Sequence, residues 1–178
     1  MLTLALLRHA KSSWDDPAQE DFDRPLNERG LKAAPAAGAA LVKLGIVPDL
    51  VLCSAAQRTR ETLKHVMAAM ALPAPPKTVF DDKLYLASPV TLLEFVRDIP
   101  EGPQCVLLVG HNPGLHALAL TLTGRGDPVA RAALATRYPT AALAVLKIDR
   151  DRWSSVRTSD ATLDAFWTPK KGFGGHET

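Results

Sequence analysis

Near its start the chain reads Leu2-Thr3-Leu4-Ala5-Leu6-Leu7-Arg8-His9, an apolar run that leads directly into an arginine and a histidine. A short run rich in Leu is typical of a strand that is buried on both faces of a sheet. Ligands of open α/β sheets bind where such strands end, and an arginine there would hold a phosphate beside the imidazole. A strand followed by an ordinary polar loop would show the same sequence pattern. Arg8-His9 alone therefore does not decide between a phosphate site and an ordinary loop.

Two further apolar runs, Leu50–Cys53 and Cys105–Val109, also lead into polar or glycine-bearing turns. Between the runs, apolar residues recur at helical spacing over residues 63–70 and 115–122. Strands that alternate with amphipathic helices indicate an α/β layer fold with a largely parallel sheet. Residues 141–148 and 161–167 read as a last pair of strands, antiparallel and near an edge.

Capping residues mark where the helices should begin. Asn112-Pro113 and Ser88-Pro89 each offer an N-cap followed by proline at the first helical position. Asn27 is expected to cap a third helix that runs to about Leu44, and Pro35 should kink it.

Composition excludes several classes of protein. The 178 residues fit one domain, and 21 basic and 19 acidic residues give a formal charge of +2 without the basic block of a nucleic-acid binder. The first apolar run is too short to span a membrane, and no cleavage signal accompanies it, so we expect a cytoplasmic protein with neither nucleic acid nor membrane as partner. No cysteine and histidine cluster has the spacing of a metal site, and no cofactor is expected.

The second and third apolar runs place polar groups in the same position as the first does. Arg58 follows Leu50–Cys53 near the start of a helix, and His111 follows Cys105–Val109. Arg58 alone would most often be a solvated surface charge, and His111 alone a turn residue. Right-handed crossovers bring such strand ends to one edge of a sheet, so Arg8, His9, Arg58 and His111 are predicted to meet around one anion.

The sequence resembles a known family at these same positions. Leu7–Ala10, Ser54–Thr62 and Gly110-His111 match, in order and context, the motifs of the histidine phosphatase superfamily. Arg8–Trp14 together with Asp23–Gly30 is similar to the small SixA-type phosphohistidine phosphatases in particular.

The resemblance extends from residue 2 to about residue 169. It implies a three-layer α/β/α fold, called phosphoglycerate-mutase-like, with a mostly parallel central sheet and one antiparallel edge strand. We expect residues 1–168 to form a single histidine-phosphatase domain and residues 169–178 to form a flexible tail, because that tail is rich in Lys and Gly.

Carried over to this chain, the resemblance makes His9 the nucleophile and places Arg8, Arg58 and His111 on the phosphate oxygens. It also places Arg24 near the mouth of the pocket, where its side chain could contact the substrate or form a salt bridge. Lys11 and Ser12 follow His9 closely enough to touch a bound phosphate, although loop residues also bond to their own backbone.

One departure from the family pattern narrows the class of substrates that the sequence predicts. Leu86 stands where many members carry a glutamate that protonates the leaving group, and the loss of a positioned acid costs about 10²–10⁴-fold in rate. Asp81 and Asp82 could supply the proton, but loop positions suit them better. When a phosphohistidine is cleaved, the leaving group is an imidazole, which depends less on protonation by an enzyme acid than an alkoxide does.

The sequence therefore predicts a metal-independent phosphatase that acts through a phosphohistidine intermediate, with a phosphohistidine protein as its most favoured partner. A phosphatase for small phosphorylated molecules and a mutase are the alternatives among enzymes. A non-catalytic phosphate-binding module is the alternative outside them, although binding alone does not need a nucleophile at His9.

Overall fold

The structure is a computed structural model, and it describes residues 1–173. Its sheet has the strand order β3-β2-β4-β1-β6-β7-β5, and β8 pairs with β7. The strands are β1 (Leu2–Arg8), β2 (Leu50–Ser54), β3 (Lys77–Asp81), β4 (Cys105–Gly110), β5 (Thr123–Gly126), β6 (Leu143–Ile148), β7 (Ala161–Thr168) and β8 (Gly172–Phe173). The helices are α1 (Glu28–Lys43), α2 (Gln57–Met70), α3 (Pro89–Arg97), α4 (Gly114–Leu122) and α5 (Pro128–Thr136), with short 3₁₀ turns η1 (Asp21–Asp23), η2 (Asp82–Leu84) and η3 (Trp153–Ser155).

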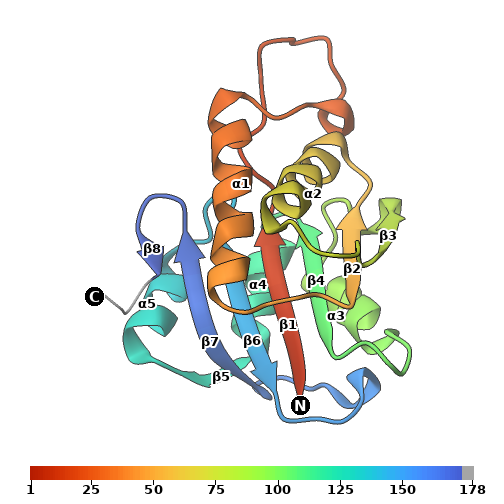
Figure 1. The fold of residues 1–178 in the computed structure, drawn as a ribbon, viewed down its shortest axis with the longest axis vertical. Helices are drawn as coiled ribbons and strands as arrows, with labels where there is room; N and C mark the ends of the chain where they lie inside the picture. The colour runs from red at the N-terminus through yellow and green to blue at the C-terminus, as the bar shows by residue number, and fades with distance from the viewer. Residues whose placement is uncertain (174–178) are drawn as a thin grey trace.

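The three strands predicted from apolar runs lie side by side in parallel at the centre of the sheet, in the order β2, β4, β1. Each extends one residue beyond its predicted run, into Arg8, Ser54 or Gly110. Figure 1 shows their arrowheads pointing to the same end, below the long loop that joins β1 to α1. The three carboxyl ends therefore share one edge, as the sequence predicted.

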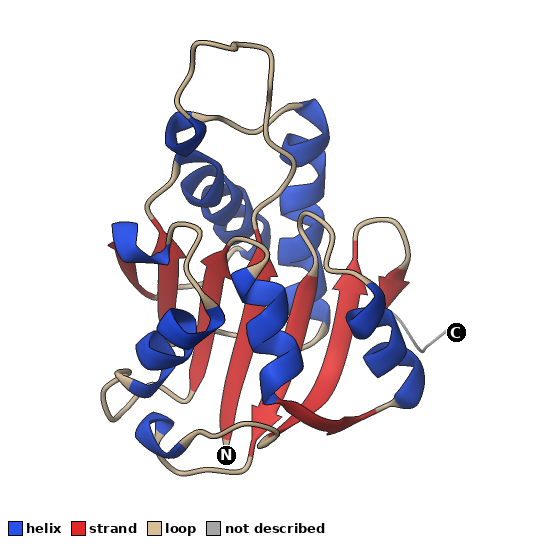
Figure 2. Ribbon diagram, turned by 180° about the vertical axis from the view of Figure 1, so that it is seen from behind, coloured by secondary structure: helices blue, strands red, loops and turns tan. Residues whose placement is uncertain are grey.

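Helices cover both faces of the sheet, which confirms the three-layer α/β/α fold. Alternate residues of β1 belong to different cores: Leu4 and Leu6 join one apolar cluster, while Ala5 and Leu7 join the other. Helices α1 and α2 cover one face (Figure 1), and α3, α4 and α5 cover the other (Figure 2). Burial on both faces explains why β1 reads as a continuous apolar run.

The far side of the sheet differs in detail from the prediction. β6 is antiparallel to β1 and to β7, as predicted for the pair, but it lies inside the sheet because β7 and then β5 continue beyond it. The predicted tail begins at residue 169, yet Gly172–Phe173 returns to pair with β7. Residues 174–178 of that predicted tail lie outside the described residues.

Two of the three predicted caps are present. The side chain of Asn27 accepts from the backbone N–H of Gly30, and α1 continues past Pro35 as one helix. Ser88 likewise accepts from the N–H of Thr91. The prediction for Asn112 is wrong, because its side chain donates to the carbonyl of Tyr138 at 2.9 Å and α4 begins at Gly114, with Pro113 as its N-cap residue. A tertiary hydrogen bond thus replaces the local cap.

Sequence reasoning missed β3, β5 and α5. β3 is an edge strand whose residues are mostly exposed, so it lacks an apolar run.

In the described part of the chain, no helix combines the length and apolar character that crossing a bilayer requires.

Candidate active site

The four residues predicted to meet do lie together at the carboxyl edge of the sheet. Arg8 ends β1 opposite Gly110, so His9 and His111 both follow directly after paired strands. The N–H of His9 donates to the carbonyl of Gly110 at 3.0 Å, and the two imidazole centroids are 5.2 Å apart. Arg58, in the first turn of α2, brings its charge close enough to affect both imidazoles. Four residues from three strand ends thus form one cluster.

The imidazole of His9 is held in a defined tautomer. Its Nδ1–H donates to the carbonyl of Ala10 at 2.7 Å, which leaves the lone pair on Nε2. The N–H of Ala10 in turn donates to the hydroxyl of Thr62 on α2, so the loop after β1 is anchored. Burial, followed by the charges of Arg58 and Arg8, lowers the pKa of His9 to about 3, although the bond to Ala10 acts in the opposite direction. At neutral pH the ring is uncharged and can act as a nucleophile.

His111 presents one ring nitrogen without a partner. Its Nε2 lies 2.8 Å from the hydroxyl of Ser54, while its buried Nδ1 has no hydrogen bond within residues 1–173. The hydroxyl of Ser54 also accepts from the N–H of Ala56, so its own proton is free to bond to Nε2. In that arrangement Nδ1 carries the other proton and can donate to an anion. The ring of Tyr85 packs edge-on against the imidazole, with centroids 5.3 Å apart.

The two arginines of the cluster are both buried or nearly so. A terminal nitrogen of Arg8 donates to the carbonyl of Tyr138 at 2.9 Å, but its buried Nε has no partner in the described chain. Arg58 donates to the backbone carbonyl and to the carboxylate of Asp21. An unpaired N–H of Arg8 next to a charged Arg58 is the arrangement that a bound phosphate would satisfy.

Of the remaining site candidates, Arg24 and Ser12 contact each other, whereas Lys11 does not take part in that contact. Each nitrogen of Arg24 makes a bond within the protein: Nε to the carbonyl of Ser13, and the terminal nitrogens to the carboxylate of Asp21 and the hydroxyl of Ser12. Arg24 also stacks on Trp14, 3.2 Å from the ring centroid. Lys11 is exposed, and its carbonyl accepts from Asn27. These bonds fold the loop after β1 back on itself, and a substrate contact for Arg24, Ser12 or Lys11 stays a prediction.

The segment after β3 offers no acid to the cluster. Leu86 is half-exposed and adopts a left-handed backbone, with φ of 48°. The carboxylate of Asp81 accepts from the N–H of Lys83, so this side chain caps the start of η2. The carboxylate that does contact the cluster is Asp21, which the sequence did not single out. Its position three residues before Arg24 was the available signal.

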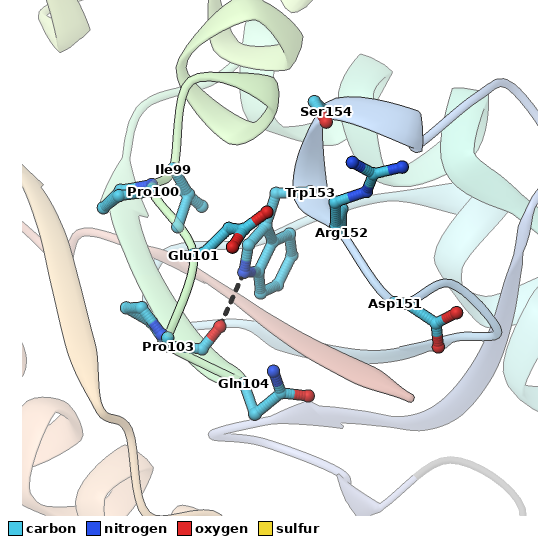
Figure 3. A pocket seen from close by; sticks show the side chains of 10 residues that line it. Ile99, Pro100, Glu101, Pro103, Gln104, Asp151, Arg152, Trp153 and Ser154 are labelled. Atoms are coloured by element: carbon cyan, nitrogen blue, oxygen red, sulfur yellow. Dashed lines mark hydrogen bonds between the residues drawn. The ribbon is translucent and has the colours of Figure 1, made fainter.

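A hollow elsewhere in the molecule does not belong to this cluster. It has a volume of about 370 Å³ and lies beside the residues that precede β4, at the opposite end of the strand from His111. Its walls include Glu101, Arg152 and Trp153, whose indole N–H donates to the carbonyl of Pro103 at 2.8 Å (Figure 3). No member of the cluster lines it. Nor do any three His, Cys, Asp or Glu side chains gather as a metal site within residues 1–173.

Comparison with known proteins agrees with this arrangement of residues. Residues 4–82 match the family described as histidine phosphatase superfamily (branch 1). The uncharacterized protein ML1117 of Mycobacterium leprae is 36% identical over 168 residues, which cover 92% of this chain and 100% of that protein. The chain belongs to the histidine phosphatase superfamily.

Solved structures place it in the SixA-type group of phosphatases. A protein assigned as phosphohistidine phosphatase SixA, from Agrobacterium tumefaciens, is 33% identical with a TM-score of 0.79, covering 94% of this chain and 98% of that one. The protein of the same name from Nakamurella multipartitia is also 33% identical with a TM-score of 0.79, covering 94% and 96%. The phosphoglycerate-mutase-like fold and the SixA-type assignment are therefore confirmed.

Because the two imidazoles are buried and uncharged, the free energy of unfolding should fall on acidification. Burial lowers the pKa of both His9 and His111 to about 3, whereas 6.5 is the ordinary value, so the unfolded chain binds more protons between those two values. Each histidine should cost about 1 kcal/mol of stability between about pH 7.5 and pH 5.5. Denaturant unfolding at both pH values measures this loss. His9→Gln should remove about half of it, and a loss in His9→Gln as large as that in the wild type would contradict buried neutral imidazoles.

Proposed function

We propose that this phosphatase acts without a metal, through a phosphohistidine intermediate on His9, and that its substrate is a phosphohistidine side chain of another protein. The observation that carries the proposal is a neutral His9 whose Nδ1 is bonded, so that Nε2 keeps its lone pair, in a cluster that contains unpaired N–H donors. Its Nδ1 is bonded to Ala10, and the unpaired N–H of Arg8 and the unpartnered Nδ1 of His111 lie in the same cluster.

In the first step Nε2 of His9 attacks phosphorus, the new P–N bond forms, and the bond to the leaving group breaks. Arg8, Arg58 and His111 would hold the equatorial oxygens, where negative charge is spread in the transition state. The bond from Nδ1–H to Ala10 would then stabilise the positive ring that phosphorylation creates. The protein's own N–H groups supply the charge that a metal supplies in other phosphatases.

The choice of substrate rests on the missing acid. With Leu86 at the usual position of the acid, an alkoxide would leave unprotonated and slowly. An imidazole leaving group can be protonated at its second nitrogen by solvent. The SixA proteins that this chain resembles bear the name of that substrate, phosphohistidine. A cytoplasmic phosphoprotein is therefore the partner that we propose.

A comparison of leaving groups tests the substrate. A phosphohistidine peptide should be hydrolysed about 10²–10⁴-fold faster, by kcat/KM, than an alkyl phosphate of similar size. An aryl phosphate, whose phenolate leaves more readily than an alkoxide, should fall between the two. Equal rates on the alkyl ester and the peptide would contradict the role given to the missing acid, and would favour a small phosphomonoester as substrate.

A further inference from the structure

Asp21 connects three segments around the phosphate cluster. One oxygen of its carboxylate accepts from Arg24 at 2.7 Å, and the other accepts from Arg58 at 3.0 Å and from the hydroxyl of Tyr85. These partners come from the loop before α1, from α2 and from the end of η2. Within residues 1–173, the ion pairs of the cluster's arginines go to Asp21 alone.

The carboxylate also faces water. The side chain of Asp21 is 43% exposed, whereas the side chain of its partner Arg58 is 4% exposed. The carboxylate of Asp21 therefore connects the buried Arg58 to the solvent-exposed side of the cluster. The bonds from Tyr85 and Arg24 hold it in one orientation, and the ring of Tyr85 also packs against His111.

Asp21 is ionised at neutral pH. The hydroxyl of Tyr85, followed by Arg24 and Arg58, lowers the pKa of its carboxyl to about 2 against the opposing effect of burial. It can therefore accept a hydrogen bond from water but cannot donate a proton to a leaving group in the resting enzyme. A phosphoryl group bound beside it would add negative charge and raise its basicity.

We propose that Asp21 is the catalytic carboxylate of the second step, which orients the attacking water and accepts its proton. This inference rests on the proposed function, because it concerns the breakdown of the phosphohistidine at His9. The water oxygen forms the new O–P bond, the P–Nε2 bond breaks, and its electron pair returns to Nε2. The proton lost by water goes to Asp21 and then to solvent. A weak base suffices, because a loose transition state requires little deprotonation of the nucleophile.

A purely structural role for Asp21 predicts different kinetics. If the carboxylate only held Arg58 in place, its loss would weaken phosphate binding and slow the formation of the phosphoenzyme. If it activates water, formation continues and breakdown slows. The two roles are therefore separated by measuring the two half-reactions one at a time.

The experiment phosphorylates the protein with phosphoramidate, removes the donor by rapid desalting and follows the decay of the labelled protein. In Asp21→Asn we expect the phosphoenzyme to form within about threefold of the wild-type rate and to decay about 10²–10³-fold more slowly. Asp23→Asn is the matched control, because it removes the same charge from the same 3₁₀ turn without touching the arginines. It should decay as wild type does.

A second variant keeps the test decisive if Asp21→Asn is unstable. In Asp21→Ala, added formate should restore the decay rate, since a small carboxylate can occupy the space left by the side chain. Formate that only re-formed the ion pair with Arg58 would restore the rate of phosphoenzyme formation and leave the rate of decay unchanged. Slow formation with wild-type decay, or no rescue by formate, would overturn the inference. Absence of any phosphoenzyme in the wild type would instead overturn the proposed function.

Discussion

Replacement of His9 by alanine is expected to lower kcat/KM by at least about 10⁴-fold, the largest effect of any single substitution in this protein. The variant loses the Nε2 lone pair that forms the P–N bond, and no neighbouring group can take its place. His111 lies close, but its Nε2 accepts from Ser54 and its Nδ1 carries the proton, so neither nitrogen offers a free lone pair. Steady-state hydrolysis of a phosphohistidine peptide measures the loss.

The control for this experiment is His65→Ala, which removes from α2 a histidine that has no proposed role in catalysis. It should keep wild-type activity, and thermal unfolding should show that both variants are folded. Residual activity of His9→Ala above about 1% of wild type would mean that water attacks the substrate directly. The covalent mechanism would then be wrong, although phosphate binding by the same cluster would stand.

Arg58→Ala should produce the second largest loss, about 10²–10³-fold in kcat/KM. The guanidinium donates in a buried position where solvent cannot replace it, and its removal also leaves the carboxylate of Asp21 beside the phosphate with Arg24 as its remaining ion-pair partner. Repulsion between the two anions would add to the loss of a donor. Arg58→Lys should recover little, because an ammonium cannot reproduce the paired N–H geometry.

The matched control for Arg58 is Arg60→Ala, two residues further along α2. The guanidinium of Arg60 lies over the exposed ring of Phe80, 5.3 Å from its centroid, and outside the cluster. Activity and inhibition by inorganic phosphate should be measured for both variants. A similar loss in the two would indicate general electrostatic attraction by the surface rather than a fixed contact between Arg58 and the phosphoryl group.

Most of the candidate site could be predicted because it depends on local signals that topology brings together. A buried parallel strand reads as an apolar run, and the residue that follows it lies at the carboxyl edge of the sheet. That reasoning predicted that His9 and His111 would meet, and the structure places their ring centroids 5.2 Å apart although 102 positions separate them in the sequence (111 − 9).

The parts that could not be predicted depend on long-range contacts between polar groups. The bond from Asn112 to the carbonyl of Tyr138 overrides a helix cap that local rules favour. Asp21 lies in the short turn η1, where its spacing of three residues from Arg24 is a weak local signal, and its importance comes from Arg58 and Tyr85 on distant segments. The place of β6 within the sheet likewise depends on its pairing with β1 as well as with β7, and the strand β5 beyond β7 has no apolar pattern.

The most direct test of the mechanism is to find the phosphoryl group on the enzyme. Wild-type protein mixed with a radiolabelled phosphohistidine peptide and quenched within milliseconds should carry label that is lost in acid and kept in alkali. Peptide mapping should place that label on His9, and His9→Ala should carry none. Turnover of the peptide with no trapped label at any time, or label on another residue, would contradict the account.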